Sequence, residues 1–368
     1  MQADAVIIGA GIHGCSVALQ LARAGLKPVV FEQAYPGRHA SGVNAGGVRR
    51  LGRHVAEIPL AVASMDLWHN IQELVDNDCG FHKTGQIKVA ESEAEFETLK
   101  QRVQALNALG FFHEELINQA ELKERIPAIS NHCYGAILCK DDGYAKPYQT
   151  VNAFQNAAIK AGAIFKYNQP VAKVKRDNNT WKVASASTEV EAPILVNCAG
   201  AWADKIAASL EEVVPLEAQA PMLMISERLP RFCTPVVGAT SRPLSFKQFE
   251  NGTVLIGGGH RGLVDMTQQT ASLDMAGICA NARTAGDIFP NMKSARIVRC
   301  WAGIEAVMPD QIPVISPSST YPDAYHVFGF SAHGFQLGPI TGRIISDLVL
   351  HGKTDLPIEN LSIKRFLH

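Results

Sequence analysis

Four residues near the N-terminus have the types and spacing of a dinucleotide-binding site. Gly9, Gly11 and Gly14 stand in G-x-G-x-x-G spacing, and the acid Glu32 follows further along the chain. The first glycine permits a tight turn, the second lets a pyrophosphate approach the backbone, and the third allows a helix to pack closely on a strand. A carboxylate at the position of Glu32 can bind both hydroxyls of an adenosine ribose and repels the 2′-phosphate of NADP. The pattern predicts a dinucleotide site, and the spacing alone leaves FAD and NAD open.

Apolar periodicity predicts the elements that must position these residues. Residues 6–8 (VII) form a short apolar run typical of a buried strand, and residues 29–31 (VVF) predict a second strand that ends at Glu32. Between them, apolar residues from 11 to 24 follow helical spacing, and Gly25 stops the helix. The N-terminus of that helix presents free N–H groups and a positive dipole end to phosphates. Because the strand, turn, helix, strand and acid occur in this order, the prediction is more specific than an isolated glycine triplet.

The same strand–turn–helix order returns in the middle and at the end of the chain. Residues 192–207 (APILVNCAGAWADKIA) and 326–352 each combine a strand, a glycine-containing turn and a helix, and the first of these should bring Gly200 near the dinucleotide. We therefore expect an α/β fold of mixed α+β character, with a discontinuous Rossmann-like domain and a mixed-sheet substrate domain. The expected boundaries are 1–80, 145–215 and 300–368 for the nucleotide-binding domain, and 81–144 and 216–299 for the substrate domain.

Three further elements are predicted from local patterns. Residues 57–77 have the apolar spacing of one long helix. A second helix begins after Ser92, which can act as N-cap with Glu95 three residues on, and ends at Gly110. A β-hairpin turns around Asn178 and Asn179.

Composition excludes several classes of protein. The formal net charge is −1, so neither nucleic acid nor an acidic membrane surface is an expected partner. No apolar run reaches the ~18 residues of a transmembrane helix, and the N-terminus lacks the features of a signal peptide, so we expect a cytoplasmic protein. The eight cysteines include no C-x-x-C pair, which argues against a metal site or a redox dithiol, and most should be buried thiols.

Five stretches in order resemble one family of flavoproteins. They are VIIGAGIHGCSVALQLARAG with VVFEQ, SGVNAGGVRR, NCAGAWA, WAGIEAVMPDQIPVI, and GFSAHGFQLGPITGRIISDLV. Together they resemble the D-amino-acid oxidase superfamily, which includes glycine oxidase, sarcosine oxidase and D-amino-acid dehydrogenase. The chain looks most similar to the flavin subunits of multi-subunit dehydrogenases that oxidise opines, glycine with cyanide formation, or proline and hydroxyproline. The resemblance implies FAD rather than NAD, bound by the nucleotide-binding domain.

Carried over by position, the resemblance implies a set of FAD-binding residues. They are Gly9, Gly11, Gly14 and Glu32 for ADP; Ser41, Asn44, Gly46 and Gly47 along the pyrophosphate and flavin; Val171 and Val174 near the adenine; Ala199, Gly200 and Trp202 in the second turn; and Gly334, Phe335 and Gln336 by the flavin pyrimidine ring. Gly334, Gly338 and Gly342 repeat every four residues and give a helix face on which a flat ring or a backbone can pack. Ordinary helix–sheet packing is the alternative.

Departures from the better-known relatives bear on flavin attachment and electron acceptor. Sarcosine oxidases carry a flavin-linking Cys six residues before a Pro-Asp pair; here that position is Gly303, with Cys300 three residues too early, so we predict non-covalent FAD. Oxygen-using sarcosine oxidases carry a Lys where this chain has Leu255, which favours a dehydrogenase. Glycine oxidases also lack that Lys. Lys247 is a candidate substitute, with a solvated Lys as the alternative.

A third departure concerns the substrate. Glycine oxidase has an Arg that binds the substrate carboxylate where this chain has Glu305, and an anion cannot do so. Arg49 and Arg50, directly after the NAGG turn, are the best candidates for that carboxylate; an Arg here can equally pair with phosphate or a structural acid. Glu305 would face the substrate amine or another cationic end, or remain a loop acid. His333 borders the expected site, with a packed His as the alternative. Arg242 and His260 are weaker candidates.

These features together predict a FAD-dependent dehydrogenase that oxidises the C–N bond of a small amino or imino acid by hydride transfer to flavin N5. Opines, D-proline or hydroxyproline, sarcosine and glycine remain open as substrates. Because the chain has no iron–sulfur cysteine set, the resemblance implies small iron–sulfur partner subunits as electron acceptors. Two alternatives stay open: a free-standing amino-acid oxidase that produces H₂O₂, and a non-catalytic flavin-binding subunit.

Overall fold

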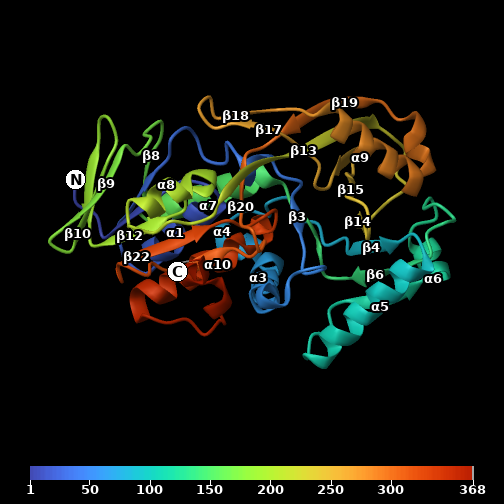
Figure 1. The fold of residues 1–368 in the computed structure, drawn as a ribbon, viewed down its shortest axis with the longest axis horizontal. Helices are drawn as coiled ribbons and strands as arrows, with labels where there is room; N and C mark the ends of the chain where they lie inside the picture. The colour runs from blue at the N-terminus through green and yellow to red at the C-terminus, as the bar shows by residue number, and fades with distance from the viewer. Residues whose placement is uncertain (367–368) are drawn as a thin grey trace.

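The computed structural model describes residues 1–366, and its centre is a six-stranded sheet (Figure 1). The strand order is β21-β22-β12-β1-β2-β8, and all neighbours are parallel except the pair β21–β22. The strands are β1 (Ala5–Ile8), β2 (Pro28–Phe31), β8 (Ile164–Lys166), β12 (Ile194–Asn197), β21 (Val314–Pro317) and β22 (Ala324–Phe328). Segments from the start, middle and end of the chain therefore lie side by side, as the three strand–turn–helix repeats predicted.

Strands β1 and β2 are continuous apolar runs because both faces of this sheet are buried. Side chains alternate between the faces of a strand. Ile7 and Val30 accordingly join one hydrophobic cluster, and Val6 and Phe31 join another. The strands predicted at residues 6–8 and 29–31 are confirmed.

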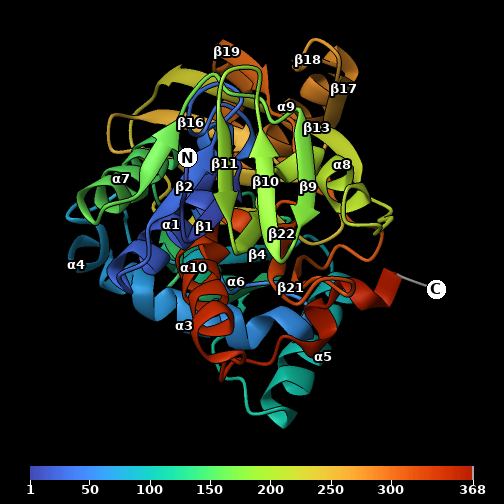
Figure 2. The ribbon, with the colours of Figure 1, turned by 90° about the vertical axis from the view of Figure 1, so that its left-hand side faces the viewer.

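Helices cover one face of the sheet, and a second, small sheet covers the other (Figure 2). The helices are α1 (Ile12–Arg23), α3 (Ile58–His69), α4 (Ile71–Val75), α7 (Pro147–Lys160) and α10 (Gly334–His351). The opposite face carries α8 (Ala203–Ala208) and three antiparallel strands, β9 (Lys173–Asp177), β10 (Thr180–Ala184) and β11 (Glu189–Ala192). The predicted hairpin is the β9–β10 turn, where Asn178 and Asn179 both have positive φ.

The second main sheet is mixed and built around one long strand, β13, which pairs with β16, β17, β19 and β20. Its strands are β4 (Gln86–Ala90), β5 (Glu115–Asn118), β6 (Gly135–Cys139), β13 (Glu217–Arg228), β14 (Val236–Ala239), β15 (Ser245–Gln248), β16 (Thr253–Gly257), β17 (Arg261–Asp265), β18 (Thr270–Ser272), β19 (Ile297–Ala302) and β20 (Glu305–Val307). Three helices pack on it: α5 (Glu93–Ala108), α6 (Gln119–Arg125) and α9 (Met275–Ile288).

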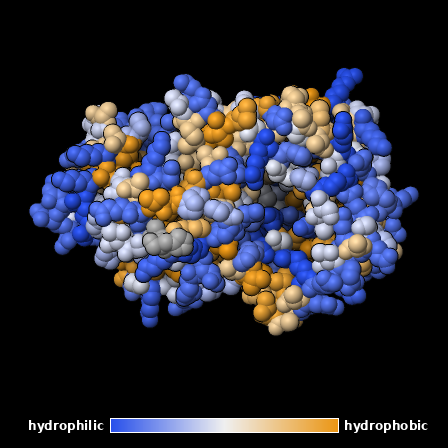
Figure 3. Space-filling model, viewed as in Figure 1, coloured by the Kyte–Doolittle hydropathy of each residue, from blue (hydrophilic) through white to orange (hydrophobic). Residues whose placement is uncertain are grey.

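Short elements join the two sheets and complete the surface. They are α2 (Ala40–Val43), the strands β3 (Gly47–Val48) and β7 (Gly143–Tyr144), and the 3₁₀ turns η1 (Val55–Glu57), η2 (Gly200–Trp202), η3 (Pro290–Ser294), η4 (Glu359–Leu361) and η5 (Ile363–Phe366). The face in Figure 3 is mostly hydrophilic, with hydrophobic residues in separate groups. Within residues 1–366, no helix is long and apolar enough to cross a membrane.

Two predicted helices can be compared with the structure. The helix predicted over residues 57–77 is interrupted at Asn70, whose backbone (φ −112°, ψ 26°) leaves the helical range between α3 and α4. The Asn70 side chain bonds back to the Asp66 carbonyl, and such local bonds compete with helical hydrogen bonds. The cap of α5 is confirmed, because Ser92 Oγ accepts the Glu95 N–H at 3.3 Å.

Candidate functional site

The glycine turn between β1 and α1 excludes side chains at two of its three positions. Gly9 has a φ of 103°, and a Cβ there would lie 2.3 Å from the Cys198 carbonyl oxygen. At Gly14 a Cβ would lie 1.9 Å from the Gly9 carbonyl oxygen. These two glycines therefore permit the turn and the close packing of α1. Gly11 instead lines a cavity, and Ser41 Oγ lies 2.8 Å from where its Cβ would be.

Glu32 follows β2, and its carboxylate is held by two backbone donors. One oxygen accepts the Ala10 N–H at 2.9 Å, and the other accepts the Ala34 N–H at 2.8 Å. Burial raises the pKa of Glu32, although both backbone bonds act to lower it. Because both donors come from the loops after β1 and β2, the acid is fixed beside the glycine turn with lone pairs left for ribose hydroxyls.

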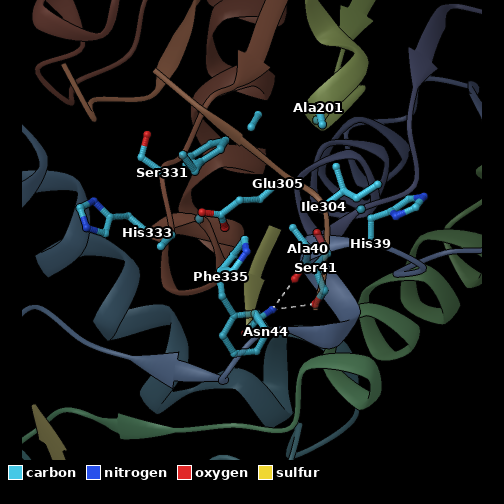
Figure 4. A pocket seen from close by; sticks show the side chains of 18 of the residues that line it. His39, Ala40, Ser41, Asn44, Ala201, Ile304, Glu305, Ser331, His333 and Phe335 are labelled. Carbon is cyan, nitrogen blue, oxygen red and sulfur yellow. Dashed lines mark hydrogen bonds between the residues drawn. The ribbon is translucent and has the colours of Figure 1, made fainter. Parts of the chain in front are cut away.

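A cavity of about 870 Å³ opens next to this turn, at the carboxyl ends of the parallel strands, and reaches the second main sheet. Its size falls in the range of cofactor and substrate clefts. Of the predicted FAD-binding residues, the cavity is lined by Gly9, Gly11, Glu32, Ser41, Asn44, Gly46, Gly47, Val171, Ala199, Gly200, Trp202, Gly334 and Phe335. Three of the predicted residues lie outside the lining: Gly14, Val174 and Gln336. Part of the lining is shown in Figure 4.

The loop that carries Ser41 and Asn44 is shaped by its own side chains. Ser41 Oγ accepts the Ile12 N–H at the start of α1 at 3.0 Å. Asn44 donates from Nδ2 to the carbonyls of Ala40 and Ser41 and accepts the Gly46 N–H at 2.7 Å (Figure 4). Asn44 therefore folds the loop rather than extending toward a ligand, and the backbone of the loop faces the cavity.

The second turn, after β12, is positioned by Asn197. Its amide donates to the Ala203 carbonyl at 2.9 Å and accepts the Ala199 N–H at 3.2 Å, and Gly200 follows with a φ of 57°. Trp202 packs against His39, with ring centroids 4.8 Å apart. Within residues 1–366, the buried Nε2 atom of His39 has no hydrogen-bond partner.

The structure separates the two adjacent arginines. Arg49 lines the cavity, and burial lowers its pKa. Arg50 lies outside the lining and forms ion pairs with Asp141 and Asp142, at 3.2 Å each. For Arg50, the pairing with structural acids that the sequence left open is thus what the structure contains.

Arg53 is a cavity residue that the sequence analysis did not single out. It is 1% exposed and donates from Nη2 to the His333 carbonyl at 3.1 Å and to Gln336 Oε1 at 3.2 Å. Its Nη1 atom has no partner among the described residues. Lys88 also lines the cavity, and burial and the charges of Arg102 and Arg49 lower its pKa. Arg49, Arg53 and Lys88 form a cationic group on the cavity wall, which we call the basic wall.

The weaker candidates are not part of the basic wall. Arg242 lines the cavity, but its guanidinium bonds Glu91 and Asp287. His260 does not line the cavity. Neither residue therefore offers a free charge to a substrate there.

Glu305 begins β20, opposite Gln219 of β13, and its side chain points into the cavity (Figure 4). Within residues 1–366, no hydrogen bond or ion pair engages its carboxylate. Burial raises the pKa of Glu305 to about 7, although the Arg261 charge acts to lower it. Glu305 can therefore exist in both protonation states near neutral pH.

His333 lines the cavity at the N-terminus of α10, and its Nδ1 atom is 3.1 Å from Glu57 Oε2. Burial and the charge of Arg53 lower the pKa of His333 to about 4, so the ring is neutral near pH 7. Gln336 is fully buried and turns toward α3, where its Nε2 donates to the Ala61 carbonyl.

The glycine repeat of α10 packs against another helix. A Cβ at Gly338 would lie 2.4 Å from Ile12 Cγ1, and one at Gly342 would lie 2.3 Å from Ser16 Oγ. These two glycines let α10 approach α1. Only Gly334, the first of the repeat, lines the cavity.

The positions that bear on flavin attachment and oxygen reactivity are both crowded. A Cβ at Gly303 would lie 2.3 Å from Val43 Cγ2, and Cys300 does not line the cavity. Leu255 is paired in register with Lys247 of β15. Lys247 is 3% exposed, donates to the Ala45 carbonyl, and lies over the Tyr144 ring at 4.6 Å. Burial lowers the pKa of Lys247 to about 7.

The lining fits FAD. The glycine turn, the α1 N-terminus and Glu32 suit an ADP group, and the cavity continues past Ser41 toward the N-terminus of α10. At Gly47 and Gly200 an added Cβ would meet no atom within 4 Å, so the backbone there borders open space. The α10 N-terminus can stabilise negative charge on a flavin ring.

Comparisons with known proteins agree with this fit. A family model described as FAD dependent oxidoreductase matches residues 4–348. An opine oxidase subunit of Rhizobium meliloti is 26% identical, over 99% of this chain and 98% of its own length. The crystal structure of L-proline dehydrogenase from P. horikoshii superposes with a TM-score of 0.92 at 27% identity, covering 99% of this chain and 98% of that one. Glycine oxidase from Geobacillus kaustophilus has the same fold, with a TM-score of 0.90 at 21% identity and full coverage of both chains.

The family match spans the glycine turn, the second turn and most of α10, which are the segments that line the cavity. The cofactor predicted from the resemblance is confirmed as FAD, and so is the predicted mixed α/β fold. The chain belongs to the family of FAD-dependent oxidoreductases.

Proposed function

We propose that this protein is a FAD-dependent dehydrogenase that oxidises the C–N bond of a small amino or imino acid. The observation that carries the proposal is the charge pattern of the cavity, where the basic wall and the free carboxylate of Glu305 line one space beside the expected flavin. A zwitterion carries complementary charges, with a carboxylate for the basic wall and an ammonium group for Glu305. D-Proline or hydroxyproline, opines, sarcosine and glycine all have this pair of groups.

FAD, when bound, accepts a hydride equivalent from the substrate carbon at N5 of its ring. The protein residues must hold the substrate in place and keep water away. We assign Arg49 to the substrate carboxylate, with Arg53 beside it, and Glu305 to the amine. Neutral His333 borders the same space, while Arg50 acts structurally through Asp141 and Asp142.

We further propose that electrons leave through small iron–sulfur partner subunits. Two findings support this: the relative from Rhizobium meliloti is named as a subunit, and Leu255 stands where a Lys promotes oxygen reduction in sarcosine oxidases. The eight cysteines are all free thiols, six of them buried, which fits a cytoplasmic location.

One observation favours a second candidate, an oxidase that reduces O₂ directly. Lys247 lies across from Leu255 on the neighbouring strand and bonds the Ala45 carbonyl in the loop that faces the cavity. A cation this close to the expected flavin could stabilise superoxide, so the position of Lys247 rather than Leu255 would determine oxygen reactivity.

Anaerobic reduction of the flavin across an amine panel tests the proposal. The panel contains glycine, sarcosine, both enantiomers of proline, 4-hydroxyproline and an arginine-derived opine. We expect at least one to bleach the flavin and to support dye reduction much faster than oxygen consumption. Equal dye and oxygen rates would establish the oxidase instead. If no amine bleaches bound FAD, the chain is a non-catalytic flavin-binding subunit.

A further inference from the structure

Glu305 has a free carboxylate inside the cavity. It extends from β20 into the space bordered by Ser41, Asn44 and Phe335 (Figure 4). No donor within residues 1–366 bonds it, whereas the other cavity acid, Glu32, accepts two backbone N–H groups. A carboxylate left without donors in a partly buried cleft is costly unless a ligand supplies the missing partner.

Few charges face Glu305 from the surrounding elements. Glu217 on β13 is exposed and bonds Gln219, and η2 carries no titratable side chain. Arg261 on β17 is the one cation that shifts the Glu305 pKa. His39 before α2 and His333 before α10 also line the cavity, and both are held neutral by burial. The protonation state of Glu305 is thus free to respond to a bound ammonium group.

We propose that Glu305 is the catalytic base that takes a proton from the substrate ammonium group before the carbon–hydrogen bond breaks. This inference rests on the proposed function. In the step, one N–H bond of the substrate breaks and an O–H bond forms on Glu305. The substrate becomes a neutral amine, whose nitrogen lone pair can form the C=N bond as the hydride leaves for FAD. The nitrogen loses a proton and the carbon loses a hydride, which accounts for both electrons.

The chemistry requires such a group because an ammonium has no lone pair with which to drive hydride loss. Simple α-amino groups are mostly protonated at neutral pH, so a base that titrates near 7 suits the task. The other basic groups are engaged: Lys247 donates to the Ala45 carbonyl, and His333 is fixed by Glu57 with a pKa of about 4. Glu305 combines an open oxygen with a pKa of about 7, raised by burial.

A binding experiment tests the protonation of Glu305 independently of catalysis. The probe is 2-furoate, a ring carboxylate with no ionisable nitrogen, titrated against the FAD-loaded protein between pH 5.5 and 9 and followed by flavin absorbance. We expect its Kd to rise about tenfold per pH unit above about 7, because the ionised acid repels an uncharged ring that cannot donate to it. Glu305→Gln should bind 2-furoate with little pH dependence, and Glu217→Gln, an exposed acid on the paired strand, should behave as wild type.

Stopped-flow reduction tests the proton transfer itself, with the panel amine that bleaches the flavin fastest. For the wild type, the reduction rate constant divided by Kd should fall below about pH 7. For Glu305→Gln the value at pH 7 should drop at least 10²-fold and then rise tenfold per pH unit, following the ionisation of the free amine. An analogue whose amine is less basic should recover much of the loss.

The outcomes separate this inference from the proposed function. If Glu305→Gln keeps the acid limb of the profile and raises only Kd, Glu305 is a binding partner and the inference is overturned while the enzyme remains a dehydrogenase. A wild-type Kd for 2-furoate that is flat with pH overturns it as well. If no amine bleaches the flavin, the proposed function fails and the inference fails with it. Retained FAD and an unchanged thermal midpoint in Glu305→Gln establish that the variant is folded.

Discussion

Arg49 and Arg50 are adjacent in the sequence, yet their guanidinium groups have different surroundings. Arg49 lines the cavity, while Arg50 bonds Asp141 and Asp142, which lie about ninety residues further along the chain. A sequence read locally cannot separate two such neighbours, because the partner acids approach only in the folded state. The glycines and Glu32 were predictable for the opposite reason: their roles depend on spacing within one strand–turn–helix unit.

A matched pair of substitutions follows from this difference. Arg49→Met should raise KM for a carboxylate substrate about 10²-fold, since losing one partner of a charged hydrogen-bonded pair costs about 2–5 kcal/mol. Arg50→Met should leave KM near that of the wild type and lower the free energy of unfolding by about 2 kcal/mol, because Asp142 loses a charged partner. Steady-state kinetics and urea unfolding of both variants measure this. The reverse pattern, with KM raised only in Arg50→Met, would contradict the assignment of Arg49.

Arg53 and Glu57 show what the sequence could not provide. Arg53 has a buried Nη1 without a described partner, and Glu57 holds His333, but neither follows a recognised motif. A Gly-Arg-His stretch was visible at residues 52–54, yet only the packing of α10 against α3 brings Arg53 to His333 and Gln336. Such residues are detected by burial and unmet hydrogen bonds rather than by spacing.

At the scale of elements, patterns of single strands and helices were readable and their pairings were not. Strands β1 and β2, the α5 cap and the β9–β10 turn follow from composition and turn residues. The region from residue 222 to 298 was predicted only as mostly strand. The partners of β13 are set by contacts distant in sequence, including β19 more than seventy residues away, and local propensity does not encode them.

A buried hydrogen-bond network ties the end of α8 to strands β12 and β22. Glu212 lies 2.6 Å from His326 Nε2 and accepts hydrogen bonds from Ser318 and Ser319. Asn197, which positions the second turn, bonds the other nitrogen of His326 at 3.3 Å. Burial acts to raise the pKa of Glu212, but its bond to His326 and the hydrogen bonds of Ser319 lower it to about 2. The network therefore supports the cavity from behind.

Glu212→Gln should destabilise the protein in a pH-dependent way. Because the folded pKa lies below the unfolded one, the ionised acid stabilises the fold above about pH 4.5, and this contribution is lost as the pH falls toward about 2. At pH 7 we expect a loss of about 3 kcal/mol in the free energy of unfolding, since breaking a buried charged pair costs about 3–5 kcal/mol. The difference from wild type should shrink below pH 4.5 in urea titrations. Glu211→Gln, the exposed neighbour, is the control, and a constant difference across pH would contradict the account.

At the scale of the whole molecule, the two main sheets have separate hydrophobic clusters and share one cavity. We propose the domain division at 1–80, 145–215 and 300–368 against 81–144 and 216–299 on this basis. The chain crosses between the sheets several times, and the strand-connecting loops at each crossing, such as residues 44–47, line the cavity. FAD binding should therefore affect both sheets rather than the glycine turn alone.

Hydrogen exchange and flavin release test this arrangement together. Adding FAD to the apoprotein should protect peptides of the β1–α1 turn and also of β4, β14 and β20, because all of these line the cavity. At an FAD concentration of 100 times Kd, the folded state should gain about 2.7 kcal/mol by mass action. Because Val43 leaves no room for a side chain at Gly303, and Cys300 lies outside the lining, acid precipitation should release all of the flavin into the supernatant. Flavin retained in the pellet would contradict non-covalent binding, and protection confined to the β1–α1 turn would contradict a cavity shared by the two sheets.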